Sequence, residues 1–121
     1  MKRSSYDRRG AEHLLPLLRS IGREITERSD VIETLEERLL SLNAGSRRTR
    51  PSEEFLTVQS QLSNQRRELR MARHELARLG CILDEDRPLR VLIPGQDGRF
   101  ESGHAWDGTN DRLMSNEAAA A

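Results

Sequence analysis

The sequence predicts a mainly α fold: an antiparallel two-helix coiled-coil hairpin with a small C-terminal β-hairpin cap. Two segments carry apolar residues at alternating steps of three and four, the heptad spacing of helices that pack along one face. The two stripes also fit a single antiparallel register. Charged residues make up 33% of the 121-residue chain and aromatic residues only 3%, a balance typical of long, solvated helices.

The first helix is expected over residues 11–43. Pro16 lies near its start, where a proline either opens the helix or kinks a turn that began around Asp7. One polar residue, Arg28, interrupts the heptad stripe. The complete stripe is Ala11, Leu14, Leu18, Ile21, Ile25, Arg28, Ile32, Leu35, Leu39 and Leu42.

A basic turn is expected over residues 44–52, because this stretch contains a helix-stopping glycine, a proline and an N-cap serine, Ser52. The second helix is expected over residues 53–79, and its stripe is again broken once, at Gln65. The complete stripe is Phe55, Val58, Leu62, Gln65, Leu69, Ala72, Leu76 and Leu79.

If the chain folds back in this turn, Leu42 faces Phe55, and the layers continue without a stutter to Leu18 with Leu79. Each layer sets an a position against a d position, as antiparallel pairing requires. Arg28 and Gln65 fall in adjacent layers. Either they form a polar contact that specifies the register, or the arginine lies across the seam with its charged end in water; we favour the second interpretation.

A small β cap is expected over residues 81–106. Residues 89–93 and 99–106 are expected strands, joined by a turn with one proline and two glycines. Phe100 and Trp106 are expected to anchor this hairpin over the open end of the coiled coil. Residues 1–112 are then expected to form a single domain.

The remaining residues, 113–121, lack apolar periodicity and end in an alanine run, so a disordered tail is expected.

Three stretches resemble a small bacterial family known as domain of unknown function 2203. Residues 11–18 (Ala-Glu-His-Leu-Leu-Pro-Leu-Leu) are similar to the family's opening motif, and residues 75–84 to the end of its second helix. Residues 91–99 resemble its strand, proline and Asp-Gly-Arg turn, although Leu92 and Ile93 replace the family's Asp-Phe. The resemblance implies a helical hairpin with a small cap, and it implies no activity.

The sequence does not indicate an enzyme, because it contains no Gly-rich phosphate loop, nucleophile elbow or paired Cys-x-x-Cys motifs. No cofactor is expected. Cys81, Asp84, Asp86 and His104 are residue types that ligate metals, but neither their spacing nor any pairing supports a site, so no metal is expected either.

A contact surface is expected at the tip of the hairpin. Arg47, Arg48 and Arg50 make this tip basic, and Leu40 and Leu56 lie beside it, off the stripes. Basic charge beside aliphatic side chains suits a protein partner or a nucleic-acid backbone, whereas the simpler interpretation is a solvated turn.

The function that we expect is therefore structural: a non-enzymatic protein that presents its hairpin to partners and self-associates, as a homodimer or with another protein. The alternative is a nucleic-acid-binding arm that uses the basic tip; it is less favoured because 20 basic residues balance 20 acidic ones. No membrane partner is expected, since no stretch approaches the roughly 20 apolar residues of a span. A lone Cys81 is compatible with the cytoplasm.

Overall fold

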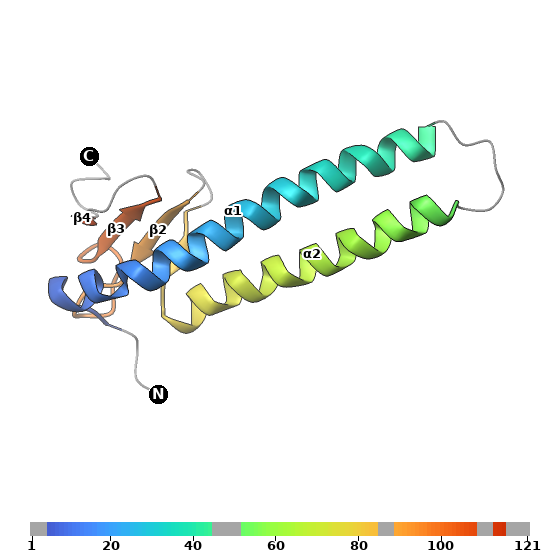
Figure 1. Ribbon diagram of the computed structural model, residues 1–121. Helices are drawn as coiled ribbons and strands as arrows, with labels where there is room; N and C mark the ends of the chain where they lie inside the picture. Colours follow the sequence, from blue (N-terminus) through green and yellow to red (C-terminus); the bar gives the residue numbers. More distant parts are fainter. Residues whose placement is uncertain (1–4, 45–51, 85–88, 109–112, 116–121) are drawn as a thin grey trace. The chain divides into compact units, whose positions relative to one another are not determined.

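A computed structural model describes residues 5–44, 52–84, 89–108 and 113–115 of the chain (Figure 1). These residues form two helices, α1 (Arg8–Ala44) and α2 (Glu53–Arg78), and a small four-stranded antiparallel sheet. The predicted fold class, mainly α with a C-terminal β-hairpin, is confirmed. The chain divides into two compact units, named here the helical unit (24–72) and the cap unit (1–23 and 73–121).

Helix α1 begins three residues before the expected start, because Asp7 caps it. The Oδ1 atom of Asp7 accepts a hydrogen bond from the backbone N–H of Gly10 at 2.7 Å, which satisfies one of the free donors of the first turn. Pro16 therefore lies inside the helix rather than at its start.

Helix α2 has well-defined signals at both ends. The Oγ atom of Ser52 accepts a hydrogen bond from the N–H of Phe55 at 3.1 Å, and two glutamates occupy the first turn, where the helix dipole favours negative charge. At the other end Gly80 adopts a φ of 79°, and the N–H of Cys81 donates to the carbonyl of Leu76. This is a Schellman ending, which turns the chain from α2 into the cap.

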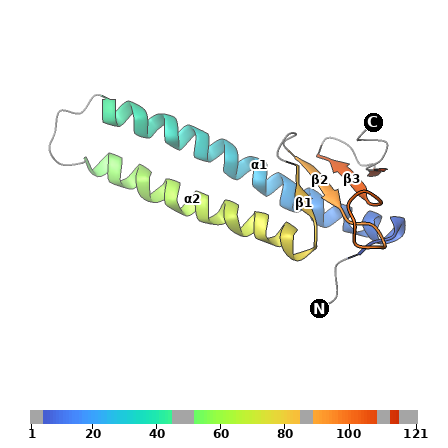
Figure 2. The ribbon, with the colours of Figure 1, turned by 180° about the vertical axis from the view of Figure 1, so that it is seen from behind.

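In the helical unit the two stripes form the buried line between α1 and α2, which lie side by side in Figures 1 and 2. Every stripe position is buried or half-buried, whereas the other positions of residues 30–43 are all exposed. Two ion pairs cross between the helices, Glu36 with Arg66 and Arg38 with Glu54. The first joins two e positions and the second two g positions, as the predicted antiparallel register requires.

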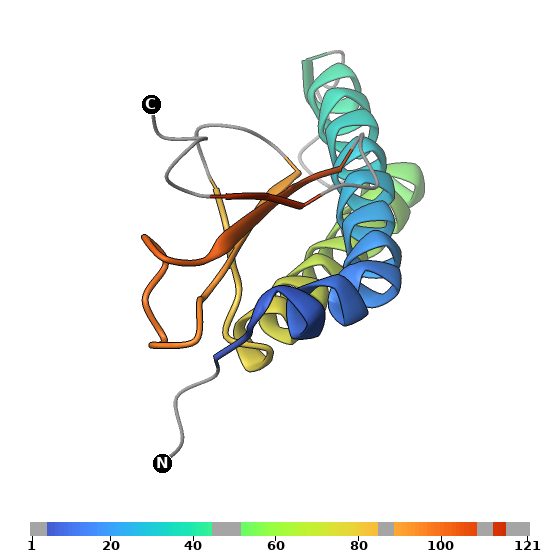
Figure 3. The ribbon, with the colours of Figure 1, turned by 90° about the vertical axis from the view of Figure 1, so that its left-hand side faces the viewer.

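In the cap unit the sheet has the order β1 (Ile82–Leu83), β2 (Arg90–Ile93), β3 (His104–Asp107) and β4 (Leu113–Ser115). Figure 2 shows β1 beside β2, and Figure 3 shows the sheet on one side of the N-terminal part of α1.

Val91 lies opposite Trp106 in the sheet, so both side chains point to the same face. That face packs on α1: a Cβ added to Gly22 would lie 3.0 Å from the indole ring of Trp106. Trp106 is buried, as expected of an anchor, but Phe100 is only half-buried.

The cap differs from the expected hairpin in three respects. Residues Ile82–Leu83 form an additional strand, β1, which pairs with β2. The return strand begins at His104, and the residues before it form a loop held by Asp97, whose carboxylate accepts hydrogen bonds from Arg99 N–H and Ser102 Oγ–H. In addition, residues 113–115 of the expected tail form β4, because the open edge of β3 offers backbone groups for pairing. Residues 116–121 lie outside the described part.

Neither helix contains a stretch long and apolar enough to cross a membrane, among the residues described.

Candidate functional site

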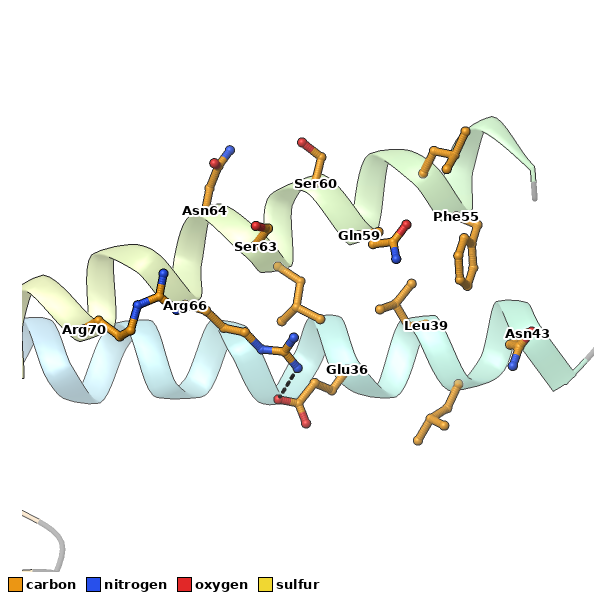
Figure 4. Close-up of a pocket in the computed structure, with 13 residues that line it drawn as sticks. Glu36, Leu39, Asn43, Phe55, Gln59, Ser60, Ser63, Asn64, Arg66 and Arg70 are labelled. Atoms are coloured by element: carbon orange, nitrogen blue, oxygen red, sulfur yellow. Dashed lines mark hydrogen bonds and ion pairs between the residues drawn. The ribbon is translucent and has the colours of Figure 1, made fainter. Parts of the chain in front are cut away.

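The helical unit has an open groove of about 990 Å³ along one side of the two helices (Figure 4). Most of its wall residues occupy positions that follow a stripe residue directly, the e and b positions of the heptad. These positions share one side of a helix because of its 3.6-residue period. The lining comprises Glu36, Leu39, Leu40, Asn43, Phe55, Leu56, Gln59, Ser60, Leu62, Ser63, Asn64, Arg66 and Arg70.

The apolar part of the groove lies at the end where α1 finishes and α2 begins. Leu40 is 71% exposed and Leu56 is 51% exposed, and each occupies a b position on its own helix. Side chains of the stripes, including Leu39 and Phe55, also line the groove and extend its apolar surface. Sequence analysis named both exposed leucines, and the structure brings them together in one groove.

The charges of the groove are divided between its two walls. On α1 the acidic Glu36 lies in the groove, and the exposed Glu33 occupies the preceding b position. On α2 the corresponding side chains are Arg66 and Arg70 (Figure 4). Arg66 Nη2 lies 3.5 Å from Glu36 Oε1, with both side chains about half exposed, so this ion pair stays accessible to solvent.

The charged wall residues were not selected as a site from the sequence. The available signal was their heptad position, since e and b residues of both helices meet on one side once the register is known.

The polar pair within the stripes forms a direct contact. Arg28 Nη1 donates a hydrogen bond to Gln65 Oε1 at 3.0 Å, and Arg28 Nε lies 3.8 Å from Glu24 Oε1. The arginine side chain is 35% exposed, so its charged end is bound to the partner helix as well as reaching solvent. The interpretation that we favoured, an arginine end that only reaches water, is therefore incomplete. Whether the contact specifies the register stays a hypothesis.

The expected basic tip cannot be placed. Arg47, Arg48 and Arg50 lie in the segment 45–51, outside the described residues.

No family model matches the chain, and no curated protein or solved structure matches it either. The resemblance to domain of unknown function 2203 therefore stays a prediction.

A smaller cleft of about 420 Å³ in the cap unit brings Tyr6, Asp97, Ser102 and His104 together. Ser102 Oγ donates to Asp97 Oδ1 at 2.5 Å, and this bond is the main cause that lowers the pKa of Asp97. Nδ1 of His104 is buried, and the described residues offer it no hydrogen-bond partner. Because the serine hydroxyl is bonded to the carboxylate, these groups do not form the serine–histidine relay that a nucleophile needs.

Cys81 is a buried core residue rather than a reactive thiol. Burial raises its pKa to about 11, so the thiolate is scarce at neutral pH. Asp86, considered with it as a metal ligand, lies outside the described residues. Within the described ranges there is no cluster of three or more His, Cys, Asp or Glu side chains that could hold a metal ion.

Proposed function

We propose that this protein is a non-enzymatic structural protein whose helical hairpin mediates self-association. The observation that supports this proposal is the pair of exposed leucines, Leu40 and Leu56, at one end of an open groove. An aliphatic side chain that stays exposed to water, rather than being buried, costs about 25 cal/mol of free energy for each Å² of apolar surface. A second chain that covers this groove would recover that free energy.

The architecture of the helical unit supports the same proposal. Its buried side chains lie along a single line between two helices, and helical hairpins of this kind commonly complete their cores by packing on further helices.

The proposal includes a cytoplasmic location. Cys81 is used as a buried free thiol in the core of the cap unit, which is compatible with a reducing compartment.

The proposal is tested by multi-angle light scattering of the full chain at increasing protein concentration. We expect a mass that rises from that of the 13.9 kDa chain toward twice that value. If the folded protein stays monomeric up to concentrations on the order of 100 µM, the dissociation constant of any dimer lies above that range. That result would refute the proposed self-association.

A further inference from the structure

We infer that the occupant of the groove is the same groove of a second copy, related by a two-fold axis that runs parallel to the helices. This inference rests on the proposed function, because it specifies the surface through which the chain self-associates. The resulting contact is a four-helix arrangement in which α1 of each copy packs against α2 of the other.

The division of charge between the walls supports this arrangement. In the groove, α1 presents Glu36, and α2 presents Arg66 and Arg70 (Figure 4). The exposed Glu33, at the b position that precedes Glu36, extends the acidic wall beyond the groove. A two-fold axis parallel to the helices turns the acidic wall of one copy toward the basic wall of the other. Opposite charges then meet at both walls at once, which favours association and sets its orientation.

The heights of the residues along the helices agree with the same axis. In the antiparallel register Leu40 and Leu56 lie at nearly the same level, between the layer of Leu39 with Val58 and that of Leu42 with Phe55. An axis parallel to the helices preserves level, so Leu40 packs against Leu56 of the partner subunit, and Leu56 against Leu40 of the partner subunit. The exposed leucines thus cover one another.

The other two-fold arrangement has its axis across the helices, and it is less favourable. It sets α1 against α1 and α2 against α2, so Glu33 and Glu36 approach the same acidic wall of the partner. Arg66 and Arg70 likewise approach a basic wall. Like charges in direct opposition disfavour that complex.

The expected contact is small. From Glu33 to Asn43 the wall of α1 extends about 15 Å at 1.5 Å per residue, which is short for an interface that typically buries roughly 800 Å² on each partner. We therefore expect a reversible dimer with a dissociation constant in the micromolar range.

The first test replaces the exposed leucines. In the full chain, Leu40→Asp with Leu56→Asp should weaken dimerisation at least about tenfold, because each leucine loses its apolar partner. The matched control is Val31→Asp with Met71→Asp, which changes two exposed apolar side chains of the helical unit that do not line the groove. The control should leave the dissociation constant within about twofold of the wild-type value.

The second test determines the orientation. Glu33→Arg alone and Arg66→Glu alone should each weaken the homodimer about three- to fivefold, since Glu33 and Arg66 lie at nearly the same level and each change sets like charges against each other. An equimolar mixture of the two variants should associate more tightly than either variant alone, because the heterodimer restores opposite charges. Both positions are exposed, so circular dichroism should show unchanged helix content.

The outcomes separate the two proposals. A wild-type chain that is monomeric throughout refutes both the proposed function and the groove contact. A wild-type dimer that Leu40→Asp with Leu56→Asp leaves intact overturns the groove contact alone, and self-association through another surface remains. A stronger homodimer for Glu33→Arg overturns the axis, because it reveals relief of repulsion between two acidic walls.

Discussion

The hydrogen bond between Arg28 and Gln65 can be measured by a double-mutant cycle with leucine at each position. The two side chains are joined at 3.0 Å within the stripes, and the guanidinium also lies near Glu24 at 3.8 Å. A hydrogen bond to a charged group contributes about 1.5 kcal/mol, whereas the half-exposed contact with Glu24 contributes a few tenths of a kcal/mol at most.

The expected magnitudes follow from the burial of each position. Each leucine gains about 1 kcal/mol by adding apolar area to the seam, and the loss of the hydrogen bond costs about 1.5 kcal/mol. Arg28→Leu and Gln65→Leu alone should therefore each lower the free energy of unfolding by about 0.5 kcal/mol. The double variant loses the one hydrogen bond and gains the apolar area of two leucines. Its free energy of unfolding should therefore exceed that of the wild type by about 0.5 kcal/mol. The coupling energy between the two positions is then about 1.5 kcal/mol.

Urea denaturation, followed by the loss of helical circular dichroism, measures these four free energies of unfolding. The ion pair of Arg38 and Glu54 provides the comparison, because both side chains are about half exposed and the expected coupling is below about 0.5 kcal/mol. A coupling energy between Arg28 and Gln65 that is no larger than this value would mean that their contact is no stronger than an exposed ion pair. That result would refute the expected contribution of about 1.5 kcal/mol.

Three further predictions concern the cap unit. Gly103→Ala should lower its stability by more than about 3 kcal/mol, because the added Cβ would lie 1.9 Å from the carbonyl oxygen of Ile93; an unchanged urea midpoint of the single tryptophan's fluorescence would contradict this. Cys81 should resist thiol reagents even at mildly alkaline pH, since burial raises its pKa to about 11, and rapid labelling of the folded chain would show that the site is open. Tyr6→Phe should cost about 1 kcal/mol in the same fluorescence assay, because the hydroxyl donates to the carbonyl of Leu79 at 2.7 Å; a variant as stable as the wild type would indicate that water replaces this bond.

The helices could be predicted closely because their signals are local. The heptad pattern predicted helices over 11–43 and 53–79, and the structure has α1 at Arg8–Ala44 and α2 at Glu53–Arg78. A start of α1 near Asp7 was one of two possibilities that the sequence left open at Pro16, and the structure has it because Asp7 caps the first turn.

The cap was less predictable because strands form by pairing between distant segments. The apolar run of β2 is visible in the sequence, but β4 is not, since its pairing with β3 depends on an edge that exists only in the folded sheet. The loop before β3 depends likewise on the hydrogen bonds of Asp97 to Arg99 and Ser102.

The sequence named two residues of the groove but did not predict the groove itself. Leu40 and Leu56 are recognisable from the sequence as aliphatic residues off the stripes, but their place in one groove requires the antiparallel register. The separation of acidic and basic walls requires it as well, because Glu36 and Arg66 are 30 residues apart along the chain.

The order of residues alone determined the two helices and the faces they bury, because a period of 3.6 residues converts spacing along the chain directly into position around a helix. The tertiary structure decided which side chains meet across the two helices and which strand edges are extended. Those contacts depend on groups far apart in the chain, and only packing and backbone pairing bring such groups together.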